Sequence, residues 1–181
     1  QSGSNKILKD MNRGHTIEDY LEIINKLKKT NPAIKFSSDF IIGYPGESDK
    51  DFEETLNLLK TVKFINSYSF IYSQRPGTPA AKMKKLDYNI AKKRLAIFQS
   101  TAVDIKMNYR KSIFGKKILV LFENRMKNNM MFFGRDEYFN SVIVKSDENL
   151  IGKIKEVKIT NGNQNTLFGE IENFNNKGFA A

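Results

Sequence analysis

In roughly the first two thirds of the chain, hydrophobic residues are spaced alternately as in helices and as in strands. Apolar positions spaced three or four residues apart predict helices at 5–11, between Thr16 and Pro32, at 49–63 and at 88–112. Short apolar runs between these helices predict strands at 34–42 and 67–72. Strands that alternate with helices form right-handed crossovers and lie parallel in one sheet, so this part is predicted to be α/β.

The pattern changes after Gly115, where short strands replace long helices. Five strand-like segments are separated by turns: KILVLF, MMFFG, FNSVIV, IGKIKEVKI and TLFGEIE. Five short strands with Gly at the bends predict a small antiparallel barrel of the OB type. The sequence therefore predicts an α/β domain at 1–113, a β-barrel at 114–175 and a tail at 176–181.

One motif stands out in the first domain: SSDFIIGYPGE, residues 37–47, followed directly by a helix. Pro45-Gly46 suits a type II turn, because Pro presets φ at its first central position and Gly accepts a positive φ at the second. Ser48 and Asp51 have the spacing of a capping box. An ordinary strand-to-helix corner shares these features, so the motif alone leaves function open.

Three loops are predicted to meet at one edge of the sheet. Residues 2–4, 43–47 and 73–78 each adjoin the carboxyl end of a strand, and Pro76, Gly77 and Pro79 rule out regular structure in the third. Ligands bind at this edge in parallel sheets and barrels. The sequence therefore predicts a binding site there.

Charge points to a polyanionic partner. The net charge is +10, and residues 82–117 contain eleven Lys and Arg side chains against only Asp87 and Asp104. Such a surplus is typical of nucleic-acid binding. A solvated helix face is the alternative.

Several classes are excluded by what the sequence lacks. It has no Cys and one His, so the common metal and iron–sulfur ligand sets cannot be assembled from it. It has no apolar run of about 20 residues and no signal-peptide pattern, so we expect a cytoplasmic protein without a membrane partner. The first residue is Gln1 rather than Met, from which we expect a fragment of a longer protein.

The blocks QSGS, LKDMNRGHT, SSDFIIGYPGESDKDFEETL and FIYSQRPGTPAAKM resemble, in order, the later half of the radical S-adenosylmethionine (SAM) barrel of methylthiotransferases. The blocks FGRDEYFNSVIV, IGKIKEVKI and NTLFG resemble the TRAM domain that follows it. The resemblance covers nearly the whole chain. It implies the C-terminal part of a TIM-like parallel barrel followed by an OB-like TRAM barrel that binds RNA.

The resemblance also implies an activity. Enzymes of this family use SAM, two 4Fe–4S clusters and an electron donor, and the tRNA branch adds a 2-methylthio group to N6-isopentenyladenosine 37 in the anticodon stem-loop. One cluster is held by a CxxxCxxC motif and the other by an N-terminal domain. Neither cysteine set occurs here, so we expect this chain alone to be inactive.

The resemblance implies site residues position by position. Those expected near the cofactor are Ser2, Ser4 and Arg13, at its amino-acid part and ribose, and Ile41 and Gly43, along its adenine. Arg75 is expected to face the substrate. The basic surplus at 82–117 separately predicts that Lys92, Lys93 and Arg94 bind RNA. Structural roles remain open for three of them: Arg13 as a helix cap, Ile41 as core, and Arg75 as a brace for its loop.

Two other functions stay open. One is the related enzyme that modifies an aspartate of a ribosomal protein, a branch that typically has an acidic residue where this chain has Arg75. The other is a cluster-free module that binds RNA without catalysis.

Overall fold

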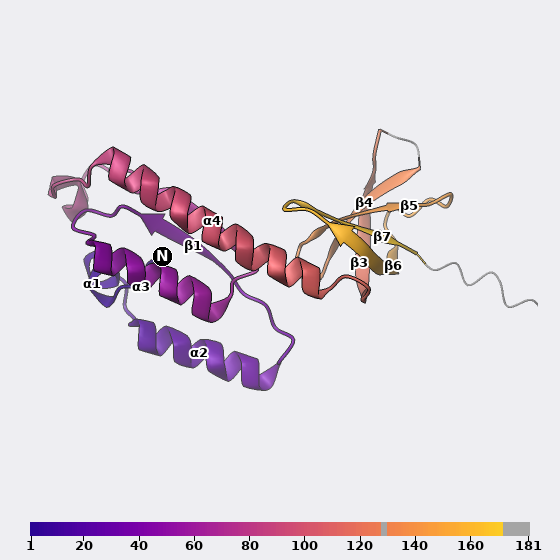
Figure 1. The fold of residues 1–181 in the computed structure, drawn as a ribbon, viewed down its shortest axis with the longest axis horizontal. Coiled ribbons are helices and arrows are strands. Elements are labelled where there is room, and N and C mark those ends of the chain that lie inside the picture. Colours follow the sequence, from indigo (N-terminus) through magenta and orange to yellow (C-terminus); the bar gives the residue numbers. More distant parts are fainter. Residues whose placement is uncertain (128–129, 172–181) are drawn as a thin grey trace, which may run out of the picture. The chain divides into compact units, whose positions relative to one another are not determined.

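The computed structural model describes residues 1–127 and 130–171 (Figure 1). It divides into two compact units, with the boundary between Lys106 and Met107. The predicted tail at 176–181 lies outside the described residues, as does the end of the predicted barrel domain at 172–175.

The first unit contains two parallel strands with helices before, between and after them. Its elements are α1 (Asn5–Asp10), α2 (Ile17–Thr30), β1 (Ser37–Ile42), α3 (Asp49–Val62), β2 (Asn66–Ile71), the 3-10 helix η1 (Pro79–Lys82) and α4 (Tyr88–Ser112), whose end belongs to the second unit. β1 and β2 pair in parallel with Ser37 opposite Asn66 and Ile42 opposite Ile71. The predicted parallel pairing is confirmed, whereas a wider TIM-like barrel stays a prediction.

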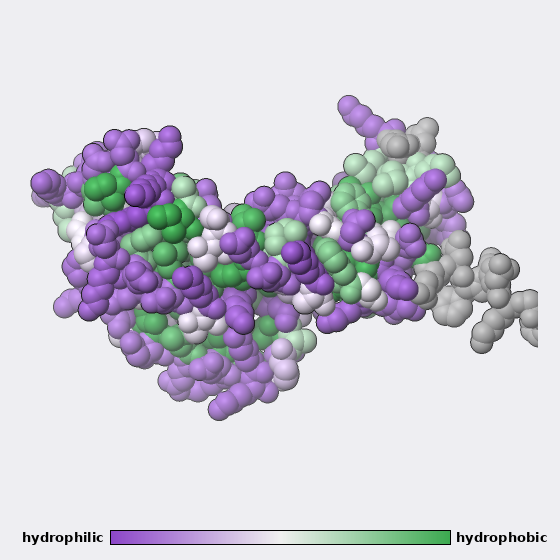
Figure 2. Space-filling model, in the orientation of Figure 1, coloured by the Kyte–Doolittle hydropathy of each residue, from purple (hydrophilic) through white to green (hydrophobic). Residues whose placement is uncertain are grey.

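The core of this unit lies on one face of β1. Phe40 and Ile42 alternate with outward positions and pack against apolar residues of α2, α3 and α4. The Phe40 ring lies 4.8 Å from that of Phe98 on α4. Figure 1 shows the three helices running alongside β1, and Figure 2 shows that hydrophilic residues cover most of this unit's surface in the same view.

Two helices begin with capping boxes, and α1 is followed by a left-handed residue. The predicted capping box of Ser48 with Asp51 forms, and Thr16 makes a second one with Asp19. Just after α1, Asn12 takes the left-handed conformation, with φ of 57°. Asn tolerates this region because its short polar side chain can hydrogen-bond locally.

The second unit is a closed five-stranded barrel. Its strands are β3 (Lys117–Arg125), β4 (Met131–Asp136), β5 (Ser141–Lys145), β6 (Ile154–Gly162) and β7 (Thr166–Glu170), in the order β3-β4-β5-β7-β6. The OB-like barrel is confirmed, but β5 and β7 pair in parallel, so the barrel is not fully antiparallel. The parallel pair arises because β7 inserts between β5 and β6, antiparallel to β6.

Candidate functional site

A small apolar cluster lies at the carboxyl edge of β1 and β2, formed by residues in or beside the three predicted loops. Ile7 of α1, Tyr44 after β1 and Ala80 of η1 are buried together, with Tyr72 packed against them. The Tyr44 and Tyr72 rings lie 5.1 Å apart, edge to face, and the Tyr44 hydroxyl donates to the Asp10 carbonyl at 2.8 Å. The elements that flank the loops are therefore packed together, and a common binding site for the loops themselves stays a prediction.

The corner after β1 has the predicted turn. Glu47 N donates to the Tyr44 carbonyl at 2.9 Å, and Gly46 has φ of 84°, as a type II turn requires. Gly43 also has a positive φ, 73°. A Cβ on Gly43 would lie 2.8 Å from the Ala91 Cβ, so α4 makes the close approach that needs a glycine.

The buried side chain of Glu47 stabilises the corner after β1 through hydrogen bonds. Its side chain is 2% exposed. One carboxylate oxygen, Oε2, accepts from Gly43 N at 3.2 Å, and the other, Oε1, accepts from Arg94 Nη1 at 2.6 Å. Burial raises the pKa of Glu47, and the hydrogen bond and charge of Arg94 oppose that rise. The carboxylate of Glu47, the last residue of the turn, thus joins Gly43, the residue before the turn, to α4.

The expectation that Arg94 binds RNA is wrong. Its side chain is 8% exposed, and its Nη2 donates to Asp49 at 2.6 Å while its guanidinium lies 5.5 Å from the Phe52 ring centre. The Arg94 guanidinium is therefore paired with two carboxylates and contacts an aromatic ring within the protein. The helical spacing could have indicated that Arg94 is buried, because it lies three residues after Ala91 and four before Phe98, which are both buried on the same side of α4.

Ser2 and Ser4 are turned toward α3. Ser2 Oγ lies 3.2 Å from Thr55 Oγ1, and Ser4 Oγ donates to Asp51 Oδ1 at 2.6 Å. Gly3 N donates to Thr55 Oγ1 at 2.9 Å. Both serine hydroxyls are thus engaged within the protein, and their contacts with a cofactor stay predictions. Sequence reasoning gave Asp51 only a capping role and missed Thr55, although the two are four residues apart on one face of α3.

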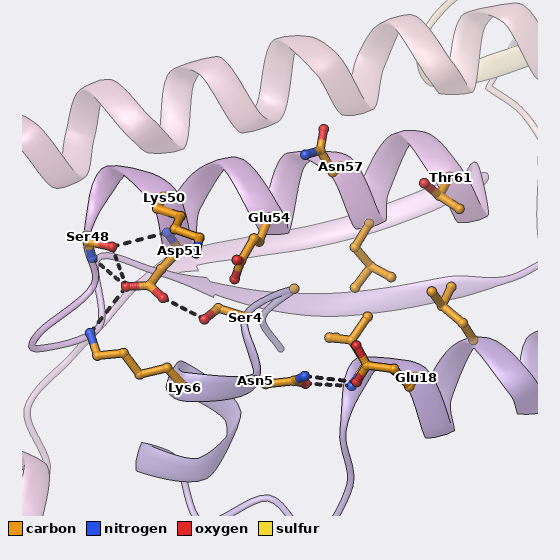
Figure 3. Close-up of a pocket in the computed structure, with 14 residues that line it drawn as sticks. Ser4, Asn5, Lys6, Glu18, Ser48, Lys50, Asp51, Glu54, Asn57 and Thr61 are labelled. Atoms are coloured by element: carbon orange, nitrogen blue, oxygen red, sulfur yellow. Dashed lines mark hydrogen bonds and ion pairs between the residues drawn. The ribbon is translucent and has the colours of Figure 1, made fainter.

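Asp51 is the centre of a polar network that Figure 3 shows. Its Oδ2 accepts from Ser48 N at 2.8 Å, from Ser48 Oγ at 2.6 Å and from the Lys6 ammonium at 3.2 Å. Burial alone raises the pKa of Asp51, but the bonds from Ser4, Ser48 and Lys6 outweigh it and hold the pKa well below its ordinary value. Lys6 also donates to the Gly46 carbonyl at 2.6 Å, so the network reaches the turn.

A cleft of about 570 Å³ opens beside this network, between α1, α2 and α3 (Figure 3). Part of its polar lining is bonded internally: Ser4 donates to Asp51, and Asn5 donates to Glu18 at 2.8 Å. Further polar residues line the rest of the cleft: Lys50, Glu54, Asn57 and Thr61. Of the residues predicted for the cofactor, Ser4 lines this cleft, whereas Arg13, Ile41 and Gly43 do not.

Arg13 and Ile41 are linked through Gln1. The exposed Arg13 guanidinium donates to the Gln1 side chain, and the Gln1 carbonyl accepts from Ile41 N at 3.0 Å. Ile41 is half-buried on the strand face away from the core, opposite Phe70, which is 60% exposed. Gln1 thus contacts both a cation and an apolar strand face, a combination that suits a ligand with a carboxylate and a flat ring.

The loop after β2 is ordered by its own hydrogen bonds. Thr78 Oγ1 donates to the Arg75 carbonyl at 2.8 Å, and Gln74 Nε2 donates to the Ala81 carbonyl at 2.6 Å. Arg75 itself is exposed, as are Lys92 and Lys93 on α4. These three cations are accessible, and their contact with RNA stays a prediction.

Iron–sulfur clusters of the usual kind do not fit this chain, because its 181 residues include no Cys. Within 1–127 and 130–171, no three His, Asp or Glu side chains lie together as a metal site would need. Nor is any helix in these ranges long and apolar enough to span a membrane.

Two family models match the chain. Residues 1–59 match the Radical SAM superfamily, and residues 111–171 match the TRAM domain. These matches agree with the resemblance inferred from the motifs.

Curated relatives match nearly the whole chain. A protein of Pelagibacter ubique is 52% identical over 171 residues, and one of Orientia tsutsugamushi is 47% identical over 173. A protein of Rickettsia akari is 46% identical over 173 residues. Each is named tRNA-2-methylthio-N(6)-dimethylallyladenosine synthase, and each alignment covers 94% of this chain. The chain spans 38% of the length of the first two relatives and 39% of the third.

The low pKa of Asp51 predicts a pH-dependent contribution to stability. A carboxyl whose pKa is lower in the folded state stabilises it above the unfolded-state pKa, about 3.9, and this contribution disappears as the pH falls toward the folded-state value. Asp51→Asn should therefore lower the free energy of unfolding at pH 7 by about 1–3 kcal/mol, and the difference from the wild type should shrink below about pH 4. Urea unfolding at a series of pH values measures this, with the exposed Glu53→Gln as control. A difference that stays constant down to pH 3 would contradict the role given to Asp51.

Proposed function

We propose that this chain, which joins a segment of the Radical SAM superfamily to a TRAM domain, belongs to a tRNA methylthiotransferase. The observation that carries the proposal is the order of the two matches together with the name shared by the relatives just described. The complete enzyme would add a 2-methylthio group to N6-isopentenyladenosine 37 in the anticodon stem-loop of tRNA, with an electron donor as a further partner.

The edge of β1 and β2 would hold SAM. Arg13 would bind the carboxylate of its amino-acid part, Ile41 would pack along the adenine, and the backbone at Gly43 would form the adjoining wall. When bound, SAM supplies the radical and the methyl group of the reaction. The cysteines that hold the two clusters would come from parts of the enzyme outside these 181 residues.

Substrate would approach through exposed cations. Lys92 and Lys93 lie one after the other on α4 and can neutralise phosphates, whereas Arg75 stands on an ordered loop next to the candidate cofactor site. A guanidinium at that place can bind a phosphate through two hydrogen bonds or stack on an unpaired base.

The first test is the salt dependence of tRNA binding. Lys92→Glu/Lys93→Glu should weaken binding of tRNA and reduce the slope of log K against log salt by about 1–2, because each lost phosphate contact removes about 0.9 from that slope. Fluorescence anisotropy at several salt concentrations gives both quantities. Lys29→Glu/Lys60→Glu makes the same change in charge at exposed positions of α2 and α3 and serves as the control. Equal effects of the two variants would show that only net charge matters.

The second test separates the tRNA enzyme from the ribosomal-protein enzyme. In the complete protein, Arg75→Glu should abolish tRNA methylthiolation, because a carboxylate repels phosphate, while SAM cleavage without substrate stays near the wild-type rate. Arg75→Lys keeps the charge and should retain part of the activity. Loss of both activities in Arg75→Glu would instead make Arg75 a brace for the SAM site. Unchanged tRNA modification would remove Arg75 from substrate binding.

A further inference from the structure

One outward face of the barrel carries a row of apolar side chains across three strands. Phe133 of β4 lies opposite Ile143 of β5, and Ile143 lies opposite Phe168 of β7. All three are half-buried and alternate with core residues on their strands, such as Phe132, Val142 and Leu167. The alternation directs them out of the barrel, so they form a continuous outer strip, which we call the aromatic row.

Polar and cationic residues flank the aromatic row on both sides. Arg135 is two residues along β4 from Phe133, and its guanidinium lies 5.5 Å from the Phe133 ring centre. On the other side, Met131 of β4 lies opposite the exposed Lys145 of β5. Arg135 also pairs with Glu123 at 3.3 Å, but both side chains are more than a third exposed, so a phosphate can compete for the cation at small cost.

A second outward apolar cluster has a different composition. Leu119 and Leu121 of β3 and Ile154 of β6 are 63%, 44% and 63% exposed, and Leu121 lies opposite Ile154. This cluster is aliphatic and offers no ring on which a base can stack. The neighbouring Lys117 pairs with Glu156 at 3.3 Å. One face of the barrel thus carries aromatic rings and an accessible guanidinium, whereas another carries aliphatic side chains.

We propose that the aromatic row is the surface on which this barrel binds unpaired RNA bases, with Phe133 and Phe168 as two stacking points and Arg135 as the phosphate contact. The two rings start from strands separated by two strand spacings, roughly 9–10 Å, so they can take two bases of one single-stranded loop. Stacking tolerates any base, because every base has a π face. The proposal rests on the proposed function in that the RNA is the tRNA substrate, and it places the loop contact on β4, β5 and β7.

The test uses this chain with two RNA probes, an anticodon stem-loop and a blunt duplex of the same length. Phe133→Ala and Phe168→Ala should each weaken stem-loop binding roughly fivefold to a hundredfold, because each removes one stacked base. Duplex binding should not change, since a duplex has no unpaired base to stack. The salt slope for the stem-loop should also stay at its wild-type value, because stacking releases no counterions.

Three further variants keep the result interpretable. Phe133→Tyr retains an aromatic face and should bind within about twofold of the wild type. Leu119→Ala shortens an exposed apolar side chain on the aliphatic face and should not weaken binding. Arg135→Ala should weaken binding of both probes and flatten the salt slope. Circular dichroism and thermal unfolding of each variant identify any loss that comes from misfolding.

Normal stem-loop binding by both Phe→Ala variants would overturn the proposal, as would an equal loss in Leu119→Ala. Neither result would contradict the proposed function, which depends on whether the complete protein methylthiolates tRNA. If the complete protein lacks that activity but this chain still shows the Phe effects on stem-loop binding, the proposed function is overturned and the aromatic row remains a general RNA-binding surface.

Discussion

The buried ion pair between Glu47 and Arg94 is the interaction on which the functional edge of the first unit depends. It lies under the turn that follows β1 and connects Gly43 N, through the Glu47 carboxylate, to a cation on α4. Arg94 Nη1 also donates to the Glu47 carbonyl at 3.1 Å, so the same group holds both main chain and side chain. Removing one member of such a pair leaves a buried charge without compensation, which costs about 3–5 kcal/mol. The ion pair therefore ties the turn to α4 and constrains the candidate cofactor loop.

A second network acts on the same edge from the other side. Asp51 on α3 binds Ser4, Ser48 and Lys6, and Lys6 in turn binds the Gly46 carbonyl. Lys6 of α1 thus connects the Asp51 carboxylate on α3 to the turn after β1. Polar groups committed in this way are unavailable to a ligand, whereas Arg13 and Arg75 are exposed and Ile41 is half-buried on the outward strand face.

Local sequence patterns predicted most of the elements, because periodicity and caps depend on neighbours in the chain. The capping box at Ser48 and the turn at Pro45-Gly46 are examples. The error at Arg94 has a different origin: its partner Glu47 is 47 residues away, and an arginine in a basic stretch looks the same whether it is solvated or paired. The roles of Ser2 and Ser4 depend in the same way on Asp51 and Thr55. The aromatic row needed strand register as well, since alternation directs Phe133 outward but only the pairing of β4, β5 and β7 aligns it with Ile143 and Phe168.

The nucleosides of cellular tRNA show whether the protein that contains this chain is a tRNA methylthiotransferase, as proposed. The complete gene would be expressed in a bacterium that lacks its own tRNA methylthiotransferase, and digested tRNA would be analysed by mass spectrometry. We expect 2-methylthio-N6-isopentenyladenosine to appear and N6-isopentenyladenosine to fall by a matching amount. An unchanged nucleoside profile, with the protein folded and its clusters loaded, would contradict the proposal.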